Sequence, residues 1–126
     1  MTVTYSTAAK NDRLDALTAL IDGGAGAGKL EIGTAAMASV LAIFTLNDPA
    51  AAAAAAAVLT ISGLPKTVTA AATGEAAEAR IVDSNDVVVV SGLTVDTAAA
   101  DIIIDNTTIT VSQDVNLNSG TITHAA

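Results

Sequence analysis

The sequence predicts a mainly β fold, an antiparallel β-sandwich or jelly-roll-like domain with one amphipathic helix at its N-terminus. Three observations support this class. Segments rich in Val, Ile and Thr recur about every eight to twelve residues between turn residues, which is typical of antiparallel sandwiches and barrels. Apolar residues follow helical intervals clearly only near the N-terminus. The length of 126 residues suits one domain with one core.

Residues 1–7 are expected to form an extended arm. Polar and apolar side chains alternate along this segment, so Val3 and Tyr5 share one face of an extended chain. An exposed strand of this kind suits pairing with the sheet edge of a partner chain. Val3 and Tyr5 are therefore candidate partner-binding residues.

Residues 8–22 are expected to form the helix, which opens a single β-rich domain over residues 8–126. Either Ser6 or Thr7 is a suitable N-cap, and a pair of glycines ends the helix. Apolar residues at helical intervals form a stripe, which is a second candidate surface for a partner. The stripe consists of Leu14, Leu17 and Ile21, with Leu20 beside it.

Strands are expected to follow the helix, with Gly, Asn, Asp and Ser at the turns between them. The expected strands are 29–34, 39–46, 55–61, 66–72, 76–83, 87–90, 100–105, 107–111 and 114–123. Apolar residues occupy nearly every position of 39–46, so both faces of this strand are expected to be buried. Ser91 and Gly92 are expected to form a turn that ends the strand 87–90.

The alanine run from Ala50 to Ala57 favours two different structures. Alanine has the highest intrinsic helix propensity. The residues from Val58 to Ile61, directly after the run, instead favour a strand. We expect a strand from Ala55 onward.

Composition and charge argue against several classes of partner. Thirteen acidic and five basic residues give a net charge of −8, which disfavours nucleic acid and anionic membranes. The only aromatic residues are one Tyr and one Phe, too few for a platform that stacks bases or sugars. There is no cysteine for a disulfide, a thiol nucleophile or a thiolate metal site. The longest apolar run, ten residues, is well short of the about 20 that span a bilayer, and no secretory signal is expected.

The glycine-rich segment from Gly23 to Lys29 matches part of a phosphate-binding loop. Such a loop follows a strand, precedes a helix, and has Ser or Thr after its lysine to hold magnesium. Here a helix precedes the segment, a strand follows it, and Leu30 stands at the hydroxyl position. We therefore expect a helix-to-strand connector and no phosphate site.

A second motif resembles the start of a calcium-binding loop. Asp114, Asn116 and Asn118 have the spacing of the first ligands of such a loop. The loop then requires a glycine where Ser119 stands and a bidentate glutamate where Ala125 stands. The alternation is therefore expected to be the solvent side of a strand, without a metal.

The remaining candidates for chemistry are carboxylate pairs and one histidine. The pairs are Asp12 with Asp15, Asp83 with Asp86, and Asp101 with Asp105. The first pair is expected on the solvent side of the helix, and the other two at strand ends, where Asp is a common turn former. His124 is the only histidine and has no second imidazole or thiolate with which to share a metal. We expect no catalytic residue, no cofactor and no enzyme activity.

The stretch from Tyr5 to Gly26, followed by Leu30-Glu31-Ile32, resembles the opening of a family of small virion proteins of tailed bacteriophages. The segment from Ala79 to Ser84 and the closing strands from Asp101 to Thr123 are similar to the same family in order and spacing. The resemblance therefore spans nearly the whole chain. The sequence departs from the family at Ala50–Ala57, where a Phe and glycines are more usual.

This resemblance implies a decoration (cement) protein on the outer surface of a phage capsid, or a neck or fibre-base component. The implied partners are the major capsid protein and further copies of the chain, as a dimer or a trimer. The implied location is the virion surface, after synthesis in the host cytoplasm. A receptor-binding or glycan-binding virion module is the alternative, and an enzyme is a third class.

Overall fold

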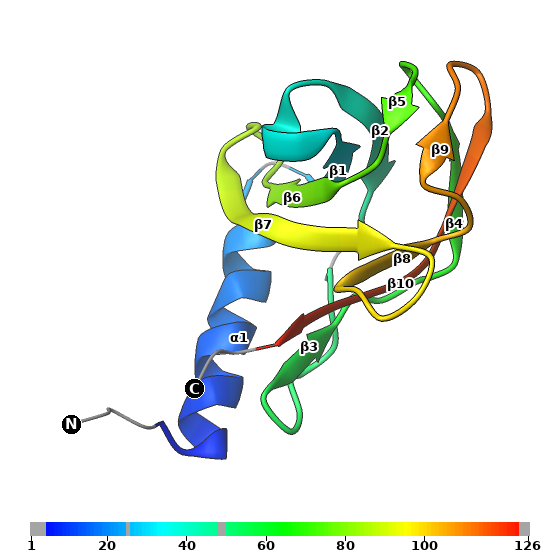
Figure 1. Cartoon of the computed structure of the whole chain (residues 1–126). Helices are drawn as coiled ribbons and strands as arrows, with labels where there is room; N and C mark the ends of the chain where they lie inside the picture. The colour runs from blue at the N-terminus through cyan, green and yellow to red at the C-terminus, as the bar shows by residue number, and fades with distance from the viewer. Residues whose placement is uncertain (1–4, 25, 48–49, 124–126) are drawn as a thin grey trace.

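The protein is mainly β, with one helix at its N-terminus (Figure 1), as the sequence predicts. The computed structural model describes residues 5–24, 26–47 and 50–123. In chain order the elements are α1 (Thr7–Ile21), β1 (Lys29–Gly33), the 3₁₀ turn η1 (Ala35–Met37), β2 (Val40–Thr45), β3 (Val58–Thr60), β4 (Lys66–Thr69), β5 (Gly74–Glu75), β6 (Glu78–Val82), β7 (Val88–Asp96), β8 (Ile102–Ile104), β9 (Thr108–Ile109) and β10 (Asp114–Thr123).

Eight strands of the described chain form one mixed, strongly curled half-barrel sheet, and β5 and β9 form a second sheet of two strands. The order in the large sheet is β2-β1-β6-β7-β8-β10-β3, and β4 also pairs with β10. The long strand β10 holds this side together, because β4 pairs with its first half and β3 with its last residues. Figure 1 shows β10 running from the small sheet to the side of α1.

The expectation of a wholly antiparallel sheet is wrong at one place, because β7 and β8 run parallel. Parallel neighbours usually need a crossover of a dozen or more residues. Here the connection between Asp96 and Ile102 is a short loop, and the parallel ladder is correspondingly only two residue pairs long. The side chain of Asp101 extends the contact by accepting the backbone N–H of Thr94 at 3.1 Å.

The curl of the sheet encloses the core. The two sides of the sheet approach each other where the Ala71 N–H donates to the Leu41 carbonyl at 2.8 Å. The largest fully buried side chains are Phe44, Leu14, Ile21, Leu30, Ile32, Leu41, Leu59, Ile81, Ile102, Ile104, Ile109 and Leu117. Aliphatic side chains from the strands and from α1 thus fill one core around a single phenylalanine.

The helix α1 begins and ends within one residue of the predicted bounds. Ser6 is its N-cap, since the Ser6 hydroxyl accepts the Ala9 N–H at 3.1 Å. The predicted arm 1–7 is wrong at Thr7, which is already helical, and its residues 1–4 lie outside the described part of the chain. The helix is also less amphipathic than expected, because Leu20 and several alanines lie on its exposed side.

The predicted turn at Ser91-Gly92 is a bulge inside β7. The strand continues to Asp96, and its register with β6 shifts between the pairs Ile81–Val90 and Ala79–Leu93. Gly92 has φ +73°, a conformation that side chains with a Cβ rarely adopt. A glycine after a polar residue predicts a turn and a bulge equally well, and here the pairing of β6 with both halves of β7 decides the outcome.

The strand β2 has only one fully buried face. Ile43 is 43% exposed, although Leu41 and Phe44 are buried. The prediction that both faces are covered holds for Leu41 but is wrong at Ile43, two residues further along the same face. No described element covers Ile43 fully.

The alanine run and β3 form a tight hairpin, here called the alanine hairpin (residues 50–61). Ala51 bridges to Ile61, and Ala55 and Val58 exchange backbone hydrogen bonds at 3.1 and 2.9 Å. The two turn residues, Ala56 and Ala57, have φ +52° and +62°. Those angles are the ones a two-residue hairpin turn requires, although Asn and Gly adopt them more readily than Ala. The strand predicted from Ala55 is therefore correct only from Val58 onward.

Candidate interaction surface

Polar side chains on the inner side of α1 hold the alanine hairpin by its backbone. Three acceptors, spaced four and seven residues apart along the chain, lie on the same side of the helix. Asn11 Oδ1 accepts the Ala57 N–H at 2.9 Å, Asp15 Oδ1 accepts the Ala54 N–H at 2.7 Å, and the Asp22 carboxylate accepts the Ala50 N–H at 3.1 and 3.2 Å. These side chains take the place of a neighbouring strand for three N–H donors of the hairpin, those of Ala50, Ala54 and Ala57.

This contact corrects the prediction for Asp15. The sequence placed Asp12 and Asp15 together on the solvent side of the helix, but only Asp12 is exposed. Asp15 is half-buried against the hairpin. The spacing of Asn11, Asp15 and Asp22 indicates that they share one side of the helix. Their partners are backbone N–H groups, which no sequence pattern identifies.

The other carboxylates support turns and strand ends, as the sequence predicts. Asp83 Oδ1 accepts the N–H groups of Asn85 and Val87, which closes the turn between β6 and β7. Asp105 accepts the backbone N–H of Asn116 at 3.2 Å and its side-chain amide at 2.8 Å, which ties the end of β8 to β10. The carboxylate oxygens of Asp83 and Asp105 thus accept hydrogen bonds from groups of the same chain.

Two basic–acidic pairs among the described residues also link neighbouring segments. Lys29 contacts Asp86 at 3.2 Å, and Arg80 on β6 contacts Glu31 on β1. Lys29, which ends the glycine-rich segment, is thus engaged by a turn aspartate. The segment connects α1 to β1, as the sequence predicts.

The calcium-like motif has the strand geometry that the sequence predicts. Asp114 and Asn118 are exposed, while Val115 and Leu117 between them are buried. The described residues bring together no group of His, Asp and Glu side chains able to hold a metal ion. His124 lies outside the described residues.

The structure divides the predicted partner-binding residues into three groups. Leu14 and Ile21 are each 2% exposed, so the core of the chain itself covers them and the prediction of a partner surface there is corrected. Leu17 is half-buried against the same core. Tyr5 is exposed, and Val3 lies outside the described residues.

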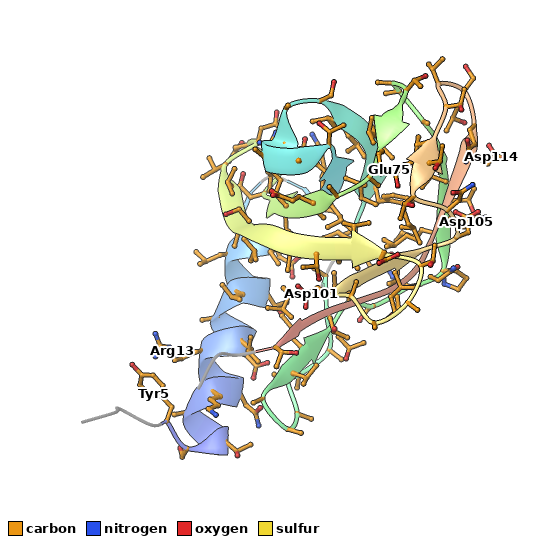
Figure 2. All side chains as sticks on the ribbon, viewed as in Figure 1. Tyr5, Arg13, Glu75, Asp101, Asp105 and Asp114 are labelled. Carbon is orange, nitrogen blue, oxygen red and sulfur yellow. The ribbon has the colours of Figure 1, made fainter. Side chains whose placement is uncertain are left out.

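The outer side of α1 is the exposed surface that the sequence stripe did not mark. Leu20 there is 59% exposed, and Asp12, Arg13 and Ala16 are also exposed. The Arg13 guanidinium lies 4.6 Å from the centre of the Tyr5 ring, a cation–π distance. Figure 2 shows Tyr5 and Arg13 beside each other at the N-terminal end of α1.

Further aliphatic side chains are exposed on the sheet. Val88 is the first residue of β7, a strand that contacts α1, and Val87 directly precedes it. Val111 lies between β9 and β10. Single exposed aliphatic residues are common, whereas adjacent ones on contacting elements mark a candidate interface. The start of β7 and the outer side of α1 are therefore the candidate interaction surface.

No binding pocket is formed by residues 5–24, 26–47 and 50–123. Among the same residues, no helix is both long and apolar enough to cross a bilayer. Comparisons of the chain with protein-family models, with curated proteins and with solved structures find no match.

Proposed function

We propose that the chain is a structural virion protein, a decoration (cement) protein that binds the outer surface of a tailed-phage capsid and stabilises the expanded head. The observation that carries the proposal is the exposure of three aliphatic side chains, Leu20 on α1 and Val87 and Val88 where β7 begins, since α1 and β7 contact each other. The engagement of carboxylates such as Asp15, Asp83 and Asp105 in the fold also supports a structural role over an enzymatic one. The sequence resemblance to small phage virion proteins is the reason for proposing a tailed-phage capsid as the particle.

The proposed mechanism is stabilisation by selective binding. A protein that binds only the assembled, expanded shell lowers the free energy of that state and leaves the free capsid subunits unaffected. At a free concentration one hundred times the dissociation constant, each occupied site contributes about 2.7 kcal/mol. Many small contributions over a shell then oppose the outward pressure of packaged DNA.

The proposal also covers the partners of the chain, its location, and the sandwich or jelly-roll-like arrangement of its strands. The partners are the major capsid protein and further copies of the chain, and the location is the virion surface after synthesis in the host cytoplasm. The curled sheet, whose sides approach at Ala71 and Leu41, supports a sandwich or jelly-roll-like arrangement around one core. The charge of −8 supports protein partners over nucleic acid or anionic membranes.

Co-sedimentation with purified capsids tests the proposal. We expect the protein to pellet with expanded capsids and to stay in the supernatant with compact precursor capsids. The double variant Val87→Ser with Val88→Ser should bind at least about tenfold more weakly, because the valine contacts are lost. Val111→Ser, which changes an equally exposed valine elsewhere, is the matched control.

Absence of the protein from expanded capsids at saturating concentration contradicts the proposal. If the protein binds glycans on an array and does not bind capsids, the result instead supports the alternative, a receptor-binding virion module. Equal binding by the wild type and the double variant rejects the start of β7 as the contact.

A further inference from the structure

We propose that one edge of β7, from Val88 to Leu93 and here called the open edge, pairs with an extended segment of the capsid protein, which adds a strand to the curled sheet. The segment has β-branched or aromatic side chains and a lysine or arginine near one end. This inference rests on the proposed function, because it specifies how the chain contacts the capsid.

The open edge is the side of β7 that has no neighbouring strand among the described residues. β6 pairs with β7 from Val88 to Thr94, whereas β8, on the opposite side, pairs only with the last two residues of β7. Figure 1 shows β8 beside only this last part of β7. The carboxylate of Asp101, directly before β8, accepts the Thr94 N–H at 3.1 Å and so marks where the open edge ends. Outside the β6 ladder, the described chain gives residues 88–93 no hydrogen-bond partner.

The burial of β7 changes along the strand in the same way. Leu93 and Val95 are 5% and 7% exposed, as expected for alternate residues of a strand whose one face lies on the core. None of the residues from Val88 to Gly92 is buried, and Val88 is 49% exposed. The helix α1 contacts β7 but leaves these residues accessible. The first half of β7 is therefore accessible to a partner.

An edge of this kind binds another extended chain through its backbone. Alternate N–H and C=O groups of an edge strand point away from the sheet and pair readily with a further strand. Many proteins protect such edges with charged residues or proline, but residues 87–93 contain neither. The register shifts against β6 bend the strand without covering its other side. A segment about 4.8 Å away can therefore continue the sheet.

The side chains near the open edge determine which segment suits it. Pairs of aromatic and β-branched residues on neighbouring strands stabilise a sheet. The four consecutive valines Val87–Val90 therefore favour a segment rich in such residues. Asp96 and Asp101 are the only charged residues from Val87 to Asp101, and both are acidic. A basic residue at that end of the segment is therefore favoured by charge complementarity.

A second copy of the chain suits the open edge less well than the capsid protein. Residues 87–101 of a second β7 carry two negative charges and no positive charge, so they bring no basic side chain to Asp96 or Asp101. Each copy also carries a net charge of −8, which adds repulsion wherever acidic residues meet. The open edge begins at Val88, which belongs to the proposed capsid contact, so one partner can engage both the edge and the exposed side chains.

Hydrogen exchange of the full chain, free and bound to purified expanded capsids, tests the open edge. We expect the amides of residues 88–93 to exchange at least about tenfold more slowly on the capsid, because new backbone hydrogen bonds protect them. Pelleting of the same samples reports the proposed function separately. Slower exchange that already develops in the free protein as its concentration rises identifies a second copy as the occupant and overturns the capsid segment.

The failure of this inference is distinguishable from the failure of the proposed function. Pelleting with expanded capsids without slower exchange at residues 88–93 overturns the open edge and leaves the proposed function intact. Absence from the pellet at saturating concentration overturns both. Pelleting together with slower exchange supports both.

A pair of lysine variants separates the edge contact from effects on folding. Ser91→Lys places a positive charge on the open edge and should weaken pelleting with expanded capsids at least about tenfold, with an unchanged circular dichroism spectrum. Thr110→Lys adds the same charge at an exposed residue between β9 and β10 and should pellet like the wild type. Loss of pelleting in both variants, or in neither, rejects the open edge.

A second pair of variants tests the basic end of the segment. Asp96→Lys reverses an exposed charge at the end of β7 and should weaken pelleting at least about tenfold, with a smaller dependence on salt. Asp114→Lys makes the same change at an exposed residue that Figure 2 shows apart from Asp101, and should have little effect. Equal effects of the two variants reflect net charge alone and overturn the basic end.

Discussion

The strands β1, β2 and β6 and the alanine hairpin are held in place by different interactions. Leu30, Phe44 and Ile81 on those strands are fully buried and fix their positions by the apolar area they remove from water. The first strand of the hairpin, residues 50–57, offers only methyl groups, and three polar side chains of α1 hold its backbone instead. Where side chains are too small to position a segment by burial, directed hydrogen bonds take over that task.

Removal of the largest buried side chain tests the first half of this comparison. Phe44→Ala should lower the free energy of unfolding by about 3–5 kcal/mol, through lost burial and the cavity left behind. Urea unfolding followed by circular dichroism measures the change. Ile43→Ala, the neighbouring and partly exposed residue on β2, should cost clearly less, and equal losses would contradict the one-sided burial of this strand.

Removal of a directed hydrogen bond tests the second half. Asp15→Ala should cost about 1–3 kcal/mol, because the part-buried Ala54 N–H loses its acceptor. Hydrogen exchange should show faster exchange at Ala54 as well. Asp12→Ala is the matched control on the exposed side of the same helix and should change stability by less than about 0.5 kcal/mol.

Relief of the strained turn in the alanine hairpin should have the smallest effect, and in the opposite direction. Ala57→Gly removes the penalty of a positive φ but keeps the N–H that binds Asn11, so we expect a gain of roughly 0.5 kcal/mol. Thermal unfolding measures this gain. Ala53→Gly, at an exposed residue of the same run without a positive φ, should destabilise by a similar amount.

The elements with a strong period were predictable from the sequence. The bounds of α1, β1 and β10 agree with the predicted ones within one residue at each end, because their apolar residues follow intervals of a helix or a strand. The alanine run was not predictable, because identical methyl groups carry no period. Gly92 was misread because the same residue type serves turns and bulges.

The candidate surface was predictable only in part. The apolar stripe of Leu14 and Ile21 was predicted to bind a partner, but the core of the same chain covers both residues. The exposed face around Ala16 combines alanines with Asp12, Arg13 and Leu20, a mixture that no hydrophobic pattern marks. The distinction between the two sides of α1 needs the position of the sheet, and that depends on long-range pairing.

The place of β10 in the chain has a consequence for synthesis. The helix that carries part of the candidate interaction surface contacts β3, and β3 pairs with the last residues of β10. During translation, α1 leaves the ribosome long before β10 has been synthesised to pair with β3. The β3 strand beside α1 therefore gains its full pairing only after residues 121–123 of β10 have been synthesised.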